Sequence, residues 1–214
     1  MIVIQFIAML TMLIDHIGAA FFPEDSYFRV VGRIAFPLYA YLLVLGYGRT
    51  RNITRYTARL AVLALISQIP FSLLFHTYHL NAVATLLAAL FTIRIIDHFR
   101  SALFIQMFVV CIAIFFMEFI AFDYGMYGLL LVLIYRYARP AHMLWLHIAL
   151  NIIIGLFING WFVQVYSFLA TVLIVYFPLL LKQIDKIRIP RWLWLSFYPA
   201  HMLVLFAVQL LEKY

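Results

Sequence analysis

The stretch Leu103-Phe-Ile-Gln-Met-Phe-Val-Val-Cys-Ile-Ala-Ile-Phe-Phe-Met117 contains no charged residue. A transmembrane α-helix needs about 20 mainly apolar residues, and this stretch with its apolar flanks reaches that length. Similar windows recur along the 214 residues, of which 68% are hydrophobic and only 11% are charged. The mean hydropathy of +1.07 lies far above that of a soluble domain. We therefore predict an all-α, polytopic transmembrane helix bundle that forms a single domain over residues 1–214.

Apolar runs between charged residues, prolines and glycines predict about nine membrane helices, with a range of eight to ten. Their expected bounds are Ile2 to Phe22, Val30 to Tyr47, Ala58 to Phe75, Ala82 to Ile96, Ala102 to Ala121, Met126 to Tyr135, Met143 to Ile158, Phe162 to Leu181 and Leu193 to Leu211. The fourth and sixth are short, which predicts that they are tilted, half-spanning or buried inside the bundle. The first apolar run lacks a preceding basic region, so it is expected to remain as a helix rather than be cleaved as a signal peptide.

The basic residues predict the orientation, because Lys and Arg near helix ends are retained on the cytoplasmic side. With a cytoplasmic N-terminus, most of the 15 basic residues fall on that side. They are Arg49, Arg51, Arg55, Arg59, Arg94, Arg100, Arg136, Arg139, Lys182, Lys186, Arg188 and Arg191. Arg29, Arg33 and Lys213 then lie outside, and nine helices place the C-terminus outside. The same asymmetry explains the net charge of +7, so nucleic acid is not an expected partner.

Two ionisable residues lie deep in the first predicted helix. Asp15 and His16 are roughly 10 Å from its outer end at 1.5 Å per residue, a depth where such groups are costly and are functional candidates. Arg33, near the outer end of the second helix, is the expected partner of Asp15. His16 would then be available as a general base that activates an amine or hydroxyl against a thioester. A purely structural ion pair, and a histidine bonded to a neighbouring helix, are the alternatives.

Other polar residues are expected at a similar depth and could line one cavity, or could instead be interfacial or interhelical hydrogen-bonding groups. They are His76, His79, Asn81, Glu118, Asp123, Tyr124 and His201. His201 lies midway along an apolar helix and joins the candidate catalytic set. Asn81, Asp123 and Tyr124 are predicted to support the pocket. Arg33 or Tyr124 could stabilise an oxyanion by a hydrogen bond.

Four arginines cluster on the predicted cytoplasmic side, at Arg49, Arg51, Arg55 and Arg59. A guanidinium can bind a phosphate in a bidentate fashion, so the cluster is suited to coenzyme A, and anchoring to anionic lipid is the alternative. The single cysteine, Cys111, excludes a disulfide within the chain. No P-loop, dinucleotide fingerprint or metal-ligand spacing is present, so no metal is expected.

Several stretches of this sequence resemble the TraX family, bacterial membrane proteins associated with N-terminal acetylation of pilin subunits. They are Met12-Leu-Ile-Asp-His-Ile-Gly18, Gly32-Arg-Ile-Ala-Phe-Pro37, Gly46-Tyr47, Thr50-Arg-Asn52, Tyr56 to Leu60, Ile66 to Pro70, Leu80-Asn81, Asp123-Tyr-Gly125 and Phe197-Tyr-Pro-Ala-His201. The resemblance runs nearly end to end and implies acetyl transfer from acetyl-CoA. It places the family's marked positions on Asp15, His16, Arg33, Asn81 and His201. Ala84 stands where a large aromatic residue is expected, which could alter the width of the pocket.

The predicted function is that of a multi-pass acetyltransferase of the bacterial inner membrane. Its acceptor, as the resemblance implies, is the N-terminal amine of a pilin subunit, with O- or N-acetylation of a cell-surface glycan as the alternative. Direct transfer is expected rather than a covalent acyl-enzyme. A small proton-coupled transporter and a non-catalytic assembly subunit are alternatives of other classes, because intramembrane Asp, His and Arg also build proton relays. Inverted repeats would favour transport, and the sequence shows only an isolated Ile-Asp-His echo at Ile14 and Ile96.

Overall fold

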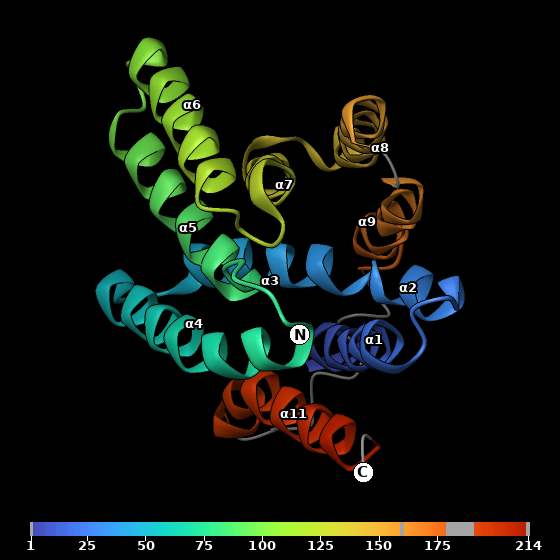
Figure 1. Cartoon of the computed structure of the whole chain (residues 1–214). Coiled ribbons are helices and arrows are strands. Elements are labelled where there is room, and N and C mark those ends of the chain that lie inside the picture. Colours follow the sequence, from blue (N-terminus) through green and yellow to red (C-terminus); the bar gives the residue numbers. More distant parts are fainter. Residues whose placement is uncertain (1, 159–160, 179–190, 213–214) are drawn as a thin grey trace.

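The computed structural model describes residues 2–158, 161–178 and 191–212, which form a bundle of helices (Figure 1). The elements are α1 (Ile2–Phe21), α2 (Ser26–Gly32), α3 (Ala35–Arg49), α4 (Ile53–Phe75), α5 (Ala82–His98), α6 (Leu103–Phe119), α7 (Gly125–Tyr137), α8 (Pro140–Phe157), the 3-10 helix η1 (Trp161–Ser167), α9 (Phe168–Tyr176) and α11 (Arg191–Glu212). Each of the nine predicted segments is mainly helical where it is described, and the second is interrupted at Arg33 and Ile34. The predicted end of the eighth segment at Leu181, and the basic residues Lys182, Lys186 and Arg188, lie outside the described residues.

Five spans in the described residues are long and apolar enough to cross a membrane, and α6, α7 and the η1–α9 segment are shorter apolar helices. The five spans are Ile2–Phe21, Ser26–Arg49, Ile53–Phe75, Pro140–Phe157 and Trp192–Glu212. Large apolar side chains such as Leu65, Phe104 and Phe157 are exposed on the outside of the bundle. Contiguous apolar surface of this kind is suited to lipid rather than water. The chain is therefore an all-α, polytopic membrane protein, as the sequence predicted.

The two helices predicted to be short pack among other helices of the bundle. Helix α5 packs against α3, α4, α6 and α7, and α7 packs against α3, α5, α6 and α8. Leu90 and Ile93 of α5 and Leu129 and Leu131 of α7 are fully buried. Helix α7 is therefore an interior helix, whereas α5 is buried on one side and exposes Phe91 and Ile95 on the other.

The second predicted helix is broken rather than continuous, and the break positions the polar site. Helix α2 ends at Gly32 and α3 begins at Ala35, with Arg33 and Ile34 between them. A Cβ atom at Gly32 would overlap the side chain of Asp15, so this close approach of α2 to α1 requires glycine. The break therefore brings Arg33 beside a carboxylate in the middle of the bundle.

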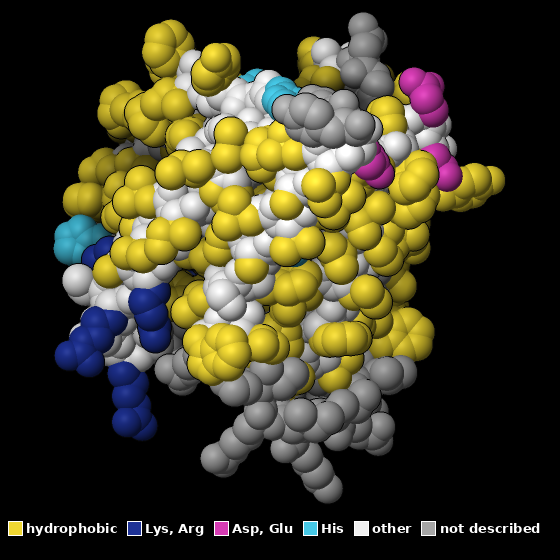
Figure 2. Space-filling view, turned by 60° about the horizontal axis from the view of Figure 1, so that its bottom comes forward, with side chains coloured by type: hydrophobic (Ala, Val, Ile, Leu, Met, Phe, Trp, Pro, Cys, Tyr) yellow, Lys and Arg dark blue, Asp and Glu magenta, His cyan; other side chains and the backbone are white. Residues whose placement is uncertain are grey.

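The two ends of the bundle differ in charge. We call the end that carries Arg49, Arg59, Arg94, Arg100 and Arg136 the basic end. Figure 2 shows arginine side chains at one end, Asp and Glu side chains at the other, and a mainly hydrophobic surface between them. This separation agrees with the charge pattern from which a cytoplasmic basic end is predicted.

At the opposite end, the loop after α4 and the loop after α6 pair with each other. The backbone N–H of Leu80 donates to the carbonyl of Ala121 at 3.1 Å, and that of Asp123 donates to the carbonyl of Leu80 at 2.8 Å. The pairing fixes Asp123 and Tyr124 beside the end of α4. These loops form one wall of the cavity that holds the polar site.

Candidate functional site

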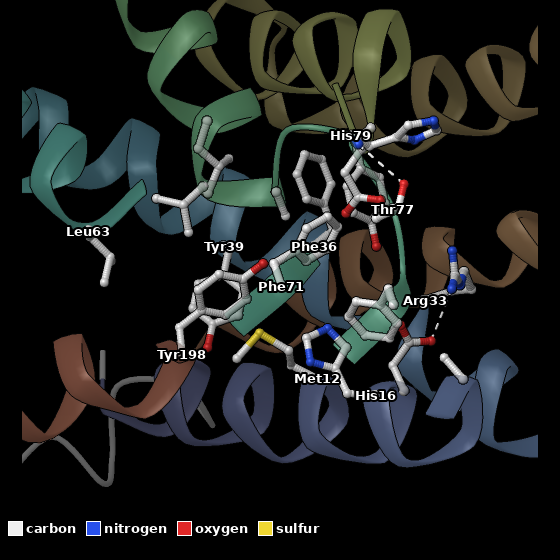
Figure 3. Close-up of a pocket in the computed structure, with 18 of the residues that line it drawn as sticks. Met12, His16, Arg33, Phe36, Tyr39, Leu63, Phe71, Thr77, His79 and Tyr198 are labelled. Atoms are coloured by element: carbon white, nitrogen blue, oxygen red, sulfur yellow. Dashed lines mark hydrogen bonds and ion pairs between the residues drawn. The ribbon is translucent and has the colours of Figure 1, made fainter. Parts of the chain in front are cut away.

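A cavity of about 260 Å³ lies inside the bundle and is lined by residues of α1, α2, α3, α4, α5 and α11 and of the paired loops. We call it the site cavity (Figure 3). Its polar lining includes Asp15, His16, Arg29, Arg33, Thr77, His79, Asp123 and Tyr124, together with Tyr39 and Tyr198. Its apolar lining includes Met12, Leu60, Leu63 and Phe71. An internal hollow with a few convergent polar groups and apolar walls is typical of a binding or reaction site.

Asp15 binds two arginines at once. Its Oδ1 lies 3.0 Å from Nη2 of Arg33, and its Oδ2 lies 3.0 Å from Nη1 of Arg29. The predicted partnership of Asp15 with Arg33 is confirmed, and Arg29 is an addition that the sequence reasoning missed. The sequence signal that could have indicated Arg29 was its spacing from Arg33, since residues four apart on a helix face the same way. Two cations share one carboxylate, so the cluster keeps a positive charge.

Arg33 is held from a second side by Gln164, which the sequence reasoning also missed. Its Nη1 donates to Oε1 of Gln164 at 2.9 Å, while Nη2 donates to Asp15. Gln164 belongs to η1 and is buried. Because both ends of the guanidinium are fixed, its position beside the cavity is set before any ligand binds. Nothing in the local sequence links residues that are 131 positions apart.

His16 is hydrogen-bonded to His201, which joins two of the predicted site residues. Its Nδ1 lies 2.8 Å from Nε2 of His201, and the two rings stack with centroids 4.9 Å apart. Nδ1 of His201 lies 2.6 Å from the backbone carbonyl of Phe197. A carbonyl oxygen only accepts, so that nitrogen of His201 must carry the proton.

The hydrogen bond from His201 to the carbonyl of Phe197 determines the tautomer of each histidine in the pair. In neutral His201 the Nε2 atom is then an acceptor, and Nδ1 of His16 must donate to it. Nε2 of His16 is left without a proton and without a hydrogen-bond partner in the described part of the chain. His16 lines the site cavity, whereas His201 lies behind it. The pair therefore presents a proton acceptor to the cavity and holds it in one tautomer.

Asp123 and Tyr124, both predicted to support the pocket, do line the site cavity. The ring of Tyr124 stacks on Phe36 with centroids 3.7 Å apart. His79 also lines the cavity from the loop after α4. These groups surround the space next to Arg33, where they can contact a bound molecule.

Asn81 is placed outside the cavity lining and instead caps a helix. Its Oδ1 accepts from the backbone N–H groups of Val83 and Ala84, and its Nδ2 donates to Ala64 and Gln68. The side chain is fully buried and its hydrogen-bonding capacity is used by protein groups. Asn81 therefore starts α5 and ties it to α4, which sets the cavity wall without contacting a ligand.

Glu118 also acts as a helix cap in this structure. Its Oε1 accepts from the backbone N–H of Met126 at 2.6 Å, at the start of α7.

The expected effect of Ala84 on the width of the pocket is wrong, since Ala84 lines an apolar groove among α4, α5 and α6 rather than the site cavity. The absence of an aromatic side chain at this position therefore changes that groove and not the width of the site.

The arginine cluster predicted to bind coenzyme A is divided by the fold. A second cavity of about 370 Å³, which we call the donor cavity, is lined by Arg49 and Arg59 at the basic end. Arg51 and Arg55 are exposed and are not part of its lining. The reason is that α4 begins at Ile53 rather than at the predicted Ala58, because Asn52 caps the helix by accepting from the N–H of Arg55.

The donor cavity adjoins the site cavity. Leu60 and Trp194 line both, so the two hollows meet at these side chains. Gln5 lines the donor cavity and His16 the site cavity, and they are separated by roughly 16 Å along α1 at 1.5 Å per residue. The two cavities are thus neighbours, with Arg49 and Arg59 lining one and His16 lining the other.

A fully buried polar cluster lies apart from these cavities and was not foreseen. Nε2 of His147 lies 2.9 Å from the Tyr127 hydroxyl and 3.0 Å from the Ser167 hydroxyl, and its Nδ1 lies 2.6 Å from the Thr171 hydroxyl. Tyr135 extends the cluster through a 2.6 Å contact with Thr171. We call this set the His147 cluster. The sequence signal that could have indicated this cluster was His147 itself, a histidine within the apolar run that follows Pro140.

The fold and the site define a polytopic membrane protein that encloses a charged cavity between its helices. The family model of the TraX protein matches residues 2–209 of the chain. The chain therefore belongs to the TraX family. The comparisons with curated proteins and with solved structures found no match.

Proposed function

We propose that the protein is a membrane-embedded acetyltransferase that takes an acetyl group from acetyl-CoA at the basic end and gives it to an acceptor at the opposite end. The observation that carries this proposal is the proton-accepting face of the His16–His201 pair, beside Arg29 and Arg33, in a cavity joined to the donor cavity. Membership of the TraX family supports the same activity.

The donor enters from the cytoplasm in this proposal, because the positive-inside rule assigns the basic end to that side. Arg49 and Arg59 in the donor cavity bind phosphates of the coenzyme. The pantetheine arm passes Leu60 and Trp194 and brings the thioester to His16. Arg51 and Arg55 add positive charge to the entrance without lining it.

His16 acts as the general base in the transfer. As the acceptor nitrogen or oxygen attacks the thioester carbon, Nε2 of His16 takes its proton, and collapse of the tetrahedral intermediate breaks the carbon–sulfur bond. The proton then passes from His16 to the leaving thiolate, which departs as free coenzyme A. His201 keeps His16 in the reactive tautomer and accepts from the imidazolium while it exists.

The positive cluster stabilises the oxyanion that forms on the carbonyl oxygen. Arg33 is fixed by Asp15 and Gln164, so its guanidinium needs little reorganisation as charge develops. The hydroxyl of Tyr124 lines the same space and supplies a neutral donor. Asp15 prevents the two arginines from repelling each other and does not itself contact the substrate.

The acceptor that family membership favours is the N-terminal amine of a pilin subunit. Asp123 contributes a carboxylate to the cavity lining near the opposite end, which is suited to holding an incoming ammonium group and taking the proton that it must lose before the amine attacks. A sugar hydroxyl gains less from that charge. A peptide amine is therefore the first acceptor to test, and a cell-surface glycan is the second.

The test is thioester consumption by the purified, detergent-solubilised protein given acetyl-CoA and a panel of peptide amines and sugars. Wild type is compared with His16→Ala, and with His142→Ala as a control because His142 is exposed and lines none of these cavities. Turnover that is lost in folded His16→Ala and kept in His142→Ala supports the proposal. Turnover that survives in His16→Ala removes the proposed base.

A proton-coupled transporter is the second candidate, and the observation that favours it is that the two cavities adjoin within the bundle. Intramembrane Asp, His and Arg also form proton relays. Protein reconstituted in vesicles would then take up protons together with a substrate and consume no acetyl-CoA. Thioester consumption without proton uptake excludes this candidate.

A further inference from the structure

A third hollow lies at the basic end, next to the donor cavity. It has a volume of about 460 Å³ and is lined by Arg94, Arg100 and Arg136 together with Asp97. We call it the arginine hollow. Thr50 lines both the arginine hollow and the donor cavity, so the two adjoin. The neighbouring hollows therefore form a series from the surface of the basic end to His16.

The arginine hollow keeps a positive charge although it contains a carboxylate. Oδ2 of Asp97 lies 2.7 Å from Nη2 of Arg136, and Oδ1 lies 3.9 Å from Nη2 of Arg100. The Tyr137 hydroxyl donates to Oδ1 at 3.1 Å. Three arginines thus face one carboxylate that is already neutralised, which leaves cationic groups available for an anion.

Arg136 is held in place more firmly than a lipid-anchoring arginine requires. Its guanidinium lies over the Tyr47 ring, 5.1 Å from the centroid, and is paired with Asp97 at the same time. Its Nε atom is buried and makes no hydrogen bond within the described residues. A fixed guanidinium presents its donors in a set direction, which suits a phosphate in a defined position.

We propose that the arginine hollow binds the phosphorylated adenosine end of the acyl-CoA donor. This inference rests on the acetyltransferase proposal. The donor is an elongated molecule with a thioester at one end and a phosphorylated nucleoside at the other, and the three adjoining hollows offer matching chemistry. Arg94 and Arg100 contact the phosphate on the ribose, Arg49 and Arg59 contact the diphosphate near Thr50, and the arm continues past Leu60.

The test compares ligands that contain or lack the adenosine end. Binding of coenzyme A, dephospho-coenzyme A and 4′-phosphopantetheine is measured on the full chain in nanodiscs of neutral lipid. Arg94→Ala and Arg100→Ala are each expected to weaken coenzyme A binding about tenfold, the effect of losing one charge-assisted hydrogen bond. Binding of 4′-phosphopantetheine should stay unchanged, and dephospho-coenzyme A should lose little.

Arg139→Ala is the matched control, because Arg139 is an exposed arginine at the same end that lines none of these hollows. It should leave all three ligands unaffected. Equal losses for coenzyme A and 4′-phosphopantetheine in the Arg94 and Arg100 variants, or no loss for either, overturns the inference. Wild type that binds coenzyme A no better than 4′-phosphopantetheine overturns it as well.

An anionic lipid headgroup is another source of phosphate for the same arginines. Nanodiscs that contain phosphatidylglycerol separate the two sources, because the inference expects coenzyme A binding to persist in them. Displacement of coenzyme A by the anionic lipid would assign the hollow to lipid and overturn the inference. Coenzyme A that binds as described without any acetyl turnover contradicts the acetyltransferase proposal alone.

Discussion

Two buried polar regions of this protein contain a histidine, and they differ in what the histidine leaves unbonded. In the His147 cluster both ring nitrogens are occupied, by Tyr127 and Ser167 on one side and Thr171 on the other. In the site cavity only Nδ1 of His16 is bonded, and Nε2 has no partner among the described residues. Both histidines are thus buried in the helix bundle. Of the two, His16 is the one that has an unbonded acceptor nitrogen next to a cavity.

The difference separates a group that stabilises the bundle from a group that can react. The His147 cluster satisfies its own hydrogen bonds, so it links α7, α8 and α9 where lipid offers no partners. Asp15 fixes Arg29 and Arg33 and leaves their charge facing a hollow. Substitutions in the first region should change stability alone, whereas substitutions in the second should change turnover, and stability as well where they unpair the two arginines.

Asp15→Asn should have the largest effect, because it removes the carboxylate that is paired with both Arg29 and Arg33. Leaving buried cations without a partner costs about 3 to 5 kcal/mol, so both the unfolding temperature and turnover should fall. Thermal unfolding in detergent and thioester consumption measure the two effects. Glu24→Gln, an exposed acidic residue near the same end, is the control. Unchanged unfolding in Asp15→Asn would contradict the ion-pair account.

His16→Gln should rank second and should act on turnover alone. Glutamine can keep a hydrogen bond to His201 but cannot serve as a base, and general-base catalysis contributes about 10²- to 10⁴-fold. The rate constant for acetyl transfer should fall by that range while the unfolding temperature stays close to wild type. A loss of stability as large as the loss of turnover would place His16 in the same class as His147.

His147→Ala should produce the reverse pattern. It leaves the Tyr127, Ser167 and Thr171 hydroxyls without a shared partner, which costs about 2 kcal/mol in the free energy of unfolding. Turnover per folded molecule should remain near that of wild type. Chemical denaturation in detergent measures the first quantity, and a normalised assay measures the second. Loss of turnover in the folded variant would show that the two regions are functionally coupled.

Arg59→Ala should have the smallest effect, which should be limited to the binding of acetyl-CoA. Arg59 lines the donor cavity and Arg55, one turn earlier on the same helix, does not. Arg59→Ala should raise the KM for acetyl-CoA about tenfold through loss of a charge-assisted contact with phosphate. Arg55→Ala should change it little. Equal effects of the two variants would favour a diffuse electrostatic role over a defined contact.

The ion pair between Asp15 and Arg33 was predictable because a short turn makes α1 and the following helix antiparallel neighbours. The two positions are only 18 residues apart, and each is a charged group within an apolar run. The bond between His16 and His201 spans 185 residues, so both were candidates from the sequence but their contact was not. Gln164 was missed because a single glutamine within an apolar run carries no distinctive signal.

The division of the arginine cluster shows where local reasoning failed. The sequence placed Arg49, Arg51, Arg55 and Arg59 together as one phosphate site because they are concentrated in one short stretch, and it predicted that the next helix begins at Ala58. The cap at Asn52 moves that start to Ile53, so the direction of each side chain follows the helical turn. Only Arg49 and Arg59 then line the donor cavity.

Sequence alone was enough to establish that the chain forms a membrane helix bundle, the approximate positions of its helices, and several of the ionisable groups buried in it. Hydropathy and burial cost are local properties, and a lipid environment leaves the backbone few alternatives to the helix. The tertiary structure alone decided which buried groups meet, which of them face a cavity and which cavities adjoin. Those relations depend on contacts between distant segments, such as Arg33 with Gln164 and His16 with His201, which no local pattern encodes.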